Sequence, residues 1–164
     1  VEQLSTHGGS NRYWLARSGE ADFTVEKTIN SEINYGLFDK DTRVLFNKRV
    51  KKSLSDFREW LFEKKKNGDV IVGYGAAHKG NTFLNFAQAD LDYIVEDNEL
   101  KWDLHTPGRN IPIKNPAVLA DEDPEKLLVV PLAWNFFDEI SARANDITNS
   151  KLSFIRYFPE VRVT

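Results

Sequence analysis

Apolar residues recur at helical spacing along the middle of the chain. Five of them, separated by four, four, three and four positions, fall on one face of an α-helix: Phe46, Val50, Leu54, Phe57 and Leu61. The pattern predicts a long amphipathic helix over residues 41–66. Asp39 or Asp41 can cap its start, and Asn67-Gly68 can end it.

After residue 66 the pattern changes to short apolar runs that alternate with helical segments. The runs cover residues 70–74, 91–95, 111–113, 127–132 and 152–158, and the helical segments cover residues 82–88, 116–121 and 136–145. Continuous apolar strands with helices between them are typical of a parallel sheet covered on both faces. We therefore predict an α/β fold: a small Rossmann-like, mostly parallel sheet with helices on both faces, preceded by the long helix and a short N-terminal strand.

The first 36 residues are less regular. Tyr13, Trp14 and Leu15 have strand propensity and follow a Gly8-Gly9 turn, which predicts a short strand over residues 12–16. Residues 18–36 are polar and poorly periodic, so we expect a linker with a short helix in its second half. The predicted organisation thus has three parts, residues 1–36, 37–66 and 67–164.

Composition narrows the function classes. The 164 residues are 41% hydrophobic and 29% charged, and the net charge of −3 argues against a broad nucleic-acid surface. No apolar stretch approaches a membrane span, and the absence of cysteine excludes disulfides and thiolate metal sites, which fits a cytoplasmic protein. The histidines lie far apart, so neither a zinc site nor a nucleophilic triad is predicted. Because the chain begins with Val1 and contains no methionine, we expect it to be a fragment of a longer protein.

Residues 70–82 carry the most chemical information, because an apolar run there enters a glycine-rich turn followed by a helical stretch. Glycines let the backbone approach an anion, and the amino end of the following helix favours negative charge. The spacing Gly73-x-Gly75-x-x-x-x-Gly80 departs from the dinucleotide fingerprint, and Lys79 precedes the last glycine instead of following it as in a P-loop. The segment indicates either a nucleotide-type anion site of another kind or a tight turn with a solvated Lys79.

Three further places carry candidate ligand contacts. Glu96 and Asp97 follow the second strand, where an acidic residue can bind ribose hydroxyls; an ordinary loop carboxylate is the alternative. His105 lies in a Thr-Pro-Gly turn, for which a structural role is favoured. Trp134 follows the fourth strand and can stack on a base or sugar or pack in the core, and Asn135 can cap the next helix.

Five ordered motifs carry a resemblance to a known family. They are GYGAAHKGNT at residues 73–82, DYIVEDN at 92–98, TPG at 106–108, IPI at 111–113 and WN at 134–135. Together with HGGSNR at 7–12 and PEV at 159–161, they resemble the C-terminal domain of the sugar-nucleotide C-methyltransferases. These enzymes transfer a methyl group from S-adenosylmethionine to a keto-deoxysugar attached to a nucleoside diphosphate. His78 and Glu96 depart from the small residue and the aspartate that are commoner at those places.

The resemblance implies a longer protein with three domains: a cysteine-rich zinc-binding domain, a methyl-donor domain and this Rossmann-like C-terminal domain. Residues 1–36 then correspond to the end of the methyl-donor domain and a linker. The zinc, the S-adenosylmethionine site and the catalytic Glu-His pair are expected upstream of Val1. The chain alone is therefore expected to be inactive and to hold the substrate.

Two functions of different classes remain open. The first is binding of a nucleoside-diphosphate sugar, with no nucleic-acid or membrane partner, by ten candidate residues: Gly73, Gly75, Lys79, Gly80, Asn81, Thr82, Asp97, His105, Trp134 and Asn135. The second is a structural or interaction domain that packs on the methyl-donor domain without binding nucleotide. A nicotinamide oxidoreductase is disfavoured, because His78 stands where the dinucleotide fingerprint has its third glycine.

Overall fold

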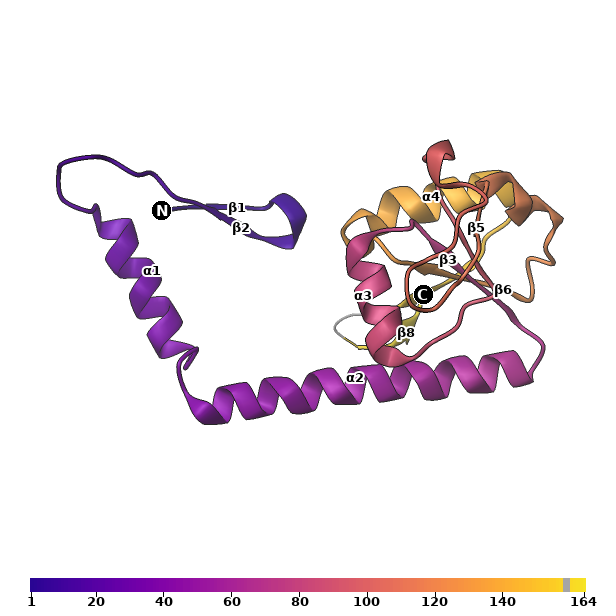
Figure 1. The fold of residues 1–164 in the computed structure, drawn as a ribbon, viewed down its shortest axis with the longest axis horizontal. Helices are drawn as coiled ribbons and strands as arrows, with labels where there is room; N and C mark the ends of the chain where they lie inside the picture. Colours follow the sequence, from indigo (N-terminus) through magenta and orange to yellow (C-terminus); the bar gives the residue numbers. More distant parts are fainter. Residues whose placement is uncertain (158–159) are drawn as a thin grey trace. The chain divides into compact units, whose positions relative to one another are not determined.

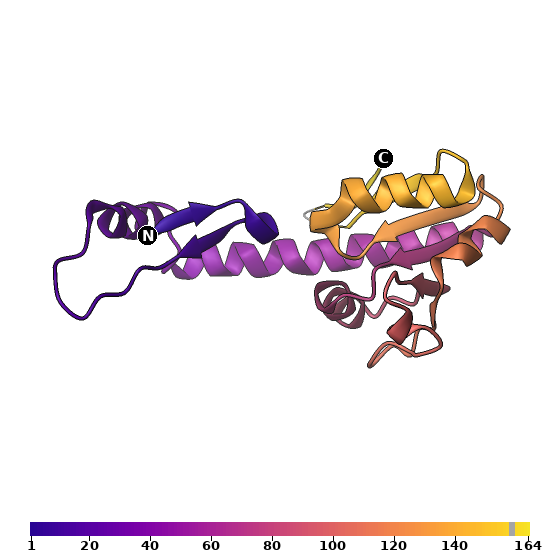
Figure 2. The same cartoon turned by 90° about the horizontal axis from the view of Figure 1, so that it is seen from above.

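The computed structural model describes residues 1–157 and 160–164, and it forms two compact units, unit 1 (Val1–Val50) and unit 2 (Lys51–Thr164). Figures 1 and 2 show both units as ribbons coloured along the sequence. Among the described residues, none of the helices combines the length and the hydropathy of a membrane-spanning segment. The three-part division expected after residues 36 and 66 remains a prediction.

Unit 1 begins with a short hairpin. β1 (Glu2–Leu4) pairs antiparallel with β2 (Ser10–Arg12), and η1 (Thr6–Gly8) joins them. The strand predicted over residues 12–16 is wrong, since β2 ends at Arg12. The reason is pairing: β1 offers three residues, which pair with Ser10–Arg12, and the strand-forming side chains Tyr13, Trp14 and Leu15 are exposed beyond the end of the ladder.

The segment predicted as a linker with a short helix is more helical than expected. α1 spans Phe23–Asn34, and the side chain of Asp22 caps it by accepting a hydrogen bond from the Thr24 N–H at 2.9 Å. Gly36, at φ +73°, ends the turn that follows the helix. No described side chain in unit 1 is buried. α1 is therefore stabilised by its N-cap and not by burial against a core.

α2 confirms the long helix predicted from the apolar stripe. It spans Lys40–Lys66, and Gly68, at φ +83°, ends it in a Schellman motif. The stripe is buried only along the part of the helix that belongs to unit 2. Phe57 and Leu61 are buried there, whereas Phe46 is 60% exposed.

Unit 2 is built on a sheet whose strand order, within the described residues, is β5-β4-β3-β6-β7-β8. The strands are β3 (Val70–Tyr74), β4 (Tyr93–Val95), β5 (Ile113–Lys114), β6 (Leu127–Pro131), β7 (Ser153–Arg156) and β8 (Arg162–Val163). The described pairings are parallel except that of β7 with β8, which confirms the predicted α/β fold. β8 was not predicted. The end of the strand predicted over residues 152–158, and the start of the PEV motif at 159–161, lie outside the described residues.

Helices cover both faces of this sheet. In Figure 2, α4 (Phe137–Thr148) lies on one side of the strands and α3 (His78–Ala87) on the other. Leu84 of α3 packs with Phe57 of α2 and Ile71 of β3, while Ile140 of α4 packs with Val72 of the same strand. Alternate residues of β3 thus serve opposite faces, which explains why the strand is apolar throughout.

The shorter elements depart from prediction in detail. The helix predicted over residues 116–121 is the 3₁₀-helix η3 (Pro116–Asp121), capped by Asn115. α3 begins at His78, four residues earlier than expected. Two further 3₁₀-helices are η2 (Glu99–Lys101) and η4 (Trp134–Phe136). Asn135 does not cap α4, because η4 includes that residue and Phe136 stands at the N-cap without a side-chain hydrogen bond.

Candidate functional site

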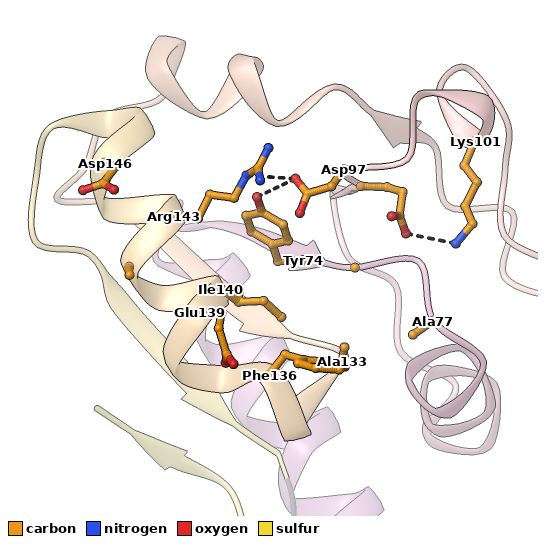
Figure 3. Close-up of a pocket in the computed structure, with 13 residues that line it drawn as sticks. Tyr74, Ala77, Asp97, Lys101, Ala133, Phe136, Glu139, Ile140, Arg143 and Asp146 are labelled. Atoms are coloured by element: carbon orange, nitrogen blue, oxygen red, sulfur yellow. Dashed lines mark hydrogen bonds and ion pairs between the residues drawn. The ribbon is translucent and has the colours of Figure 1, made fainter. Parts of the chain in front are cut away.

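A cavity of about 760 Å³ lies where β3, β4 and β6 end (Figure 3). From β3 the chain builds the sheet in one direction through β4 to β5, and it then returns to place β6 on the other side of β3. The cavity is therefore at the topological switch point, where doubly wound sheets bind ligands. Its volume falls within the range of roughly 300–1,000 Å³ that is common for small-molecule sites.

The glycine turn forms one wall of the cavity. Gly75 adopts φ +89°, a conformation that residues with side chains rarely adopt, and its N–H donates to the Val95 carbonyl at 2.8 Å. The next N–H, that of Ala76, donates to Glu96 Oε2 at 2.8 Å. These two hydrogen bonds hold the turn against the end of β4 before α3 begins.

A polar bridge crosses the cavity from β4 to α4. Asp97 Oδ1 accepts a hydrogen bond from the Tyr74 hydroxyl at 2.9 Å and lies 3.0 Å from Arg143 Nε (Figure 3). Burial, and then the hydrogen bond to Asp97, raise the pKa of Tyr74, so the hydroxyl remains a donor. The Arg143 side chain is 58% exposed. The bridge thus presents a carboxylate and an accessible guanidinium side by side.

A second ion pair closes the end of the cavity beside the glycine turn. Lys101 Nζ lies 3.1 Å from Glu96 Oε2 and donates to the Ala76 carbonyl at 3.1 Å. The Asn98 N–H donates to the other carboxylate oxygen, Glu96 Oε1, at 3.1 Å. Burial raises the pKa of Glu96, but hydrogen bonds from the Asn98 N–H, Lys101 and the Ala76 N–H outweigh burial and lower the pKa below its ordinary value. Glu96 is therefore ionised near neutral pH.

α4 supplies the opposite wall. Glu139, Arg143 and Asp146 follow one another at spacings of four and three, which places them on one face of the helix, toward the cavity. Phe136 and Ile140 add apolar surface. The charged side chains that line the cavity, among the residues described, are Glu96, Asp97, Lys101, Glu139, Arg143 and Asp146. On the α4 side, the carboxylates Asp97, Glu139 and Asp146 outnumber the one cation, Arg143, among the described lining residues, so this side suits a ligand's hydroxyl groups better than an unpaired anion.

The amino end of α3 has the opposite character. Ala77, which lines the cavity, is the N-cap of α3 and makes no side-chain hydrogen bond to the first turn. On that turn, the Lys79 ammonium lies 5.1 Å from the centre of the Trp134 ring in η4. The N–H groups and dipole at a helix amino end favour negative charge. An anionic group of a ligand would therefore be accommodated here more readily than at α4.

The ten residues predicted from the sequence do not all lie together. Gly75 and Asp97 line the cavity. Gly73 and Gly80 instead pack inside the fold: a Cβ at Gly73 would lie 2.8 Å from Leu132 Cδ1, and one at Gly80 would lie 2.5 Å from Leu132 Cβ. These two glycines let β3 and α3 approach the chain just after β6.

The other predicted residues are not part of the cavity lining. Asn81 is hydrogen-bonded within α3, and Thr82 is exposed on the same helix. His105 is exposed at an isolated bridge, and Trp134 and Asn135 belong to η4 next to the cavity wall. Their contact with a ligand stays a prediction.

The sequence analysis missed five lining residues that carry polar side chains: Tyr74, Lys101, Glu139, Arg143 and Asp146. A signal for two of them was available. Glu139 and Arg143 are spaced as one face of the helix predicted after the fourth strand, and the start of such a helix borders the switch point. Lys101 could not be found this way, since it lies in the short 3₁₀-helix η2 after β4, for which the sequence shows no periodic signal.

Among the described side chains, no group of three or more His, Cys, Asp or Glu residues is placed to hold a metal ion. In a comparison with protein families, a family model described as the C-methyltransferase C-terminal domain matches residues 5–159. The match extends over both units. No curated protein sequence matches the chain.

Proposed function

This chain belongs to the C-methyltransferase C-terminal domain family, and we propose that it holds the substrate, a nucleoside-diphosphate keto-deoxysugar, for methylation. The observation that carries the proposal is the cavity at the switch point between β3 and β6, with polar groups on three walls. S-adenosylmethionine, zinc and the catalytic base belong, in this proposal, to other domains of the full protein.

The chemistry of the reaction supports such a division. Methylation of a carbon beside a keto group needs a base for the C–H proton, stabilisation of the enolate and alignment of the donor methyl group. A domain that binds the nucleotide part of the substrate supplies none of these three requirements directly. It supplies binding energy remote from the reacting carbon, which orients the sugar ring toward the methyl donor.

The two ends of the cavity suit the two chemical parts of such a ligand. The diphosphate fits the amino end of α3, where Lys79 and the first-turn N–H groups favour negative charge. Hydroxyl groups of the ribose or the deoxysugar fit the bridge of Asp97 and Arg143, which offers both an acceptor and donors. Phe136 adds apolar surface to the cavity.

Titration of the chain with a thymidine diphosphate sugar tests the proposal. We expect saturable shifts of backbone amide signals within residues 75–82, largest at residues 78–82, because the ligand borders the glycine turn and its diphosphate binds at the first turn of α3. Amide signals of β7 and β8, at the edge of the sheet, serve as the internal control. Unchanged signals at residues 75–82 under saturating ligand would contradict substrate binding at this site.

A pair of arginine variants sharpens this test. Arg143→Gln should weaken binding of the nucleotide sugar by about tenfold or more, since it removes charge-assisted hydrogen bonds. Arg58→Gln removes the same charge from an exposed position on α2, which packs on the other face of the sheet, and should leave the affinity unchanged. Equal effects of the two variants would show that only net charge matters.

Unit 1 favours a second function of a different class. None of its described side chains is buried, and large apolar side chains are exposed in the segment after β2, in both helices and in the turn between them: Tyr13, Trp14, Leu15, Phe23, Ile33, Phe38 and Phe46. Covering apolar surface is favourable by roughly 25 cal/mol per Å². In this alternative, unit 1 packs on the methyl-donor domain of the same protein, and unit 2 binds no nucleotide.

Recombination with a separately produced methyl-donor domain distinguishes the two functions. If unit 2 holds the substrate, Lys79→Ala weakens binding of the nucleotide sugar to the recombined protein. If the chain is only an interaction domain, Lys79→Ala leaves that affinity unchanged, and Trp14→Ser weakens the association of the two parts. Trp14 is 73% exposed, so its replacement should leave the unfolding midpoint of the chain unaltered.

A further inference from the structure

The Glu96 carboxylate occupies a place that ligands take in related architectures. Its side chain is only 13% exposed, and both of its oxygens accept hydrogen bonds. Oε2 accepts from the Ala76 N–H at 2.8 Å, inside the glycine turn between β3 and α3. In doubly wound folds the backbone at this turn approaches the phosphates of a bound dinucleotide. Here an anion of the protein itself is hydrogen-bonded to that backbone.

The neighbouring N–H groups of the turn are also committed within the protein. Gly75 donates to the Val95 carbonyl and Ala77 donates to the Gly75 carbonyl, each at 2.8 Å. Of the N–H groups of Gly75, Ala76 and Ala77, that of Ala76 therefore donates to an anionic group, and the other two donate to carbonyl oxygens. Replacing the carboxylate by a phosphate would require Glu96 to leave this N–H.

Lys101 holds Glu96 in this position. Its ammonium lies 3.1 Å from Glu96 Oε2 and donates to the Ala76 carbonyl at 3.1 Å, so it binds the carboxylate and the turn together. The hydrogen bonds from the Asn98 N–H, Lys101 and the Ala76 N–H that hold the Glu96 carboxylate also lower its pKa and keep it charged. A diphosphate brought to the Ala76 N–H would meet a fixed negative charge with its cation already paired.

We propose that Glu96 is a specificity-determining residue that substitutes for a ligand phosphate at the Ala76 N–H. The cavity thereby excludes dinucleotides, whose diphosphate lies on the glycine turn, and it leaves the first turn of α3, beside Lys79, as the place for a diphosphate. The second part rests on the proposed function. The exclusion of phosphate from the Ala76 N–H does not, because it follows from the contacts of Glu96 alone.

Inorganic diphosphate is the probe that tests the exclusion, with the backbone amide signal of Ala76 as the readout. In the unaltered chain this signal should not shift in a saturable way. Glu96→Ala frees the N–H and leaves Lys101 without its carboxylate, so inorganic diphosphate should shift the Ala76 signal with an affinity about tenfold or more above that of the unaltered chain. A saturable shift of Ala76 in the unaltered chain, or no gain in a folded Glu96→Ala variant, would overturn the proposal.

Two further variants exclude simpler explanations. Glu99→Ala removes a carboxylate from the exposed surface of η2 in the same segment, and it should bring no gain. An equal gain in Glu99→Ala would mean that net charge decides, and would overturn the assignment to Glu96. Glu96→Gln keeps the shape and one acceptor oxygen but loses the charge, so it should give a smaller gain than Glu96→Ala. If Glu96→Ala fails to fold, Glu96→Gln decides: an affinity no higher than that of the unaltered chain would overturn the proposal.

The same spectra separate this inference from the proposed function. Failure of a thymidine diphosphate sugar to bind the unaltered chain contradicts the proposed function and leaves the diphosphate result with Glu96→Ala intact. Conversely, a nucleotide sugar that binds the unaltered chain and shifts Ala76 as strongly as Lys79 would support the proposed function and refute the role given to Glu96.

Discussion

Replacing Gly80 by alanine tests whether this glycine serves packing. Gly80 is buried in α3, and an alanine Cβ would lie 2.5 Å from Leu132 Cβ, whereas ordinary van der Waals contact begins at 3.4 Å. Leu132 Cβ is bonded directly to the backbone after β6, so no side-chain rotation relieves the overlap and α3 must move away from the sheet. Overpacking of this kind costs about 1–3 kcal/mol. Alanine is favoured over glycine within a helix by about 1 kcal/mol, which offsets part of that cost.

We therefore expect Gly80→Ala to lower the free energy of unfolding by up to about 2 kcal/mol, measured as a lower urea midpoint with an unchanged m-value. Thr82→Ala, at an exposed position of the same helix, is the matched control and should be neutral or slightly stabilising, because it changes only helix propensity. A midpoint for Gly80→Ala at or above that of the unaltered chain would refute the packing role and return Gly80 to the list of ligand-binding candidates.

Three other predictions concern stability. Phe57→Ala, at a fully buried site of α2, should lower the free energy of unfolding, measured in urea, by about 3–5 kcal/mol. Phe46 is 60% exposed on the same apolar stripe, so Phe46→Ala should change that free energy by about 0.5 kcal/mol or less. Burial raises the pKa of Tyr93 and of Tyr157, so above about pH 10 the folded state retains protons that the unfolded chain releases. The contribution of these tyrosines to stability should therefore be fully present below about pH 10 and be lost as the pH rises above it. Tyr157→Phe should reduce the fall of the urea midpoint with rising pH. The lowered pKa of Glu96 gives the opposite pH dependence. The contribution of Glu96 to the free energy of unfolding is present above the ordinary carboxylate pKa of about 4.3 and is lost as the pH falls through the pKa of the folded state. Glu96→Gln should therefore reduce the fall of the melting temperature at acid pH.

The helices and strands of unit 2 were predictable because their signals are local. The spacing of Phe57 and Leu61 on one helix face, and the continuous apolar run that became β3, reflect burial against a sheet with two covered faces. Boundaries were less accurate where a neighbouring element decided them. α3 starts at His78 because the glycine turn ends at Ala77, and residues 13–15 form no strand because β1 is too short to pair with them.

The sequence indicated where the cavity lies but few of the residues that line it, and ligand binding there stays a prediction. The rule that ligands bind at the carboxyl ends of parallel strands directed attention to Gly75 and Asp97, and both line the cavity. The same reasoning grouped Gly73 and Gly80 with the ligand-binding residues, although a Cβ would meet core side chains at both places: Leu132, Ile94 and Leu91 at Gly73, and Leu132 at Gly80. Spacing in the sequence cannot separate a glycine that faces a ligand from one that faces the core.

Periodicity and apolar runs report burial residue by residue, so the amino-acid sequence was enough to predict the kind of fold, the long helix and the edge of the sheet where a ligand site would lie. Which groups meet at that edge depends on tertiary packing. Arg143 reaches Asp97, and Glu96 closes onto Ala76, through contacts between segments that are far apart in the chain. Such contacts depend on how the strands and helices pack, and they determine which polar groups of the site are already paired and which can bind a ligand.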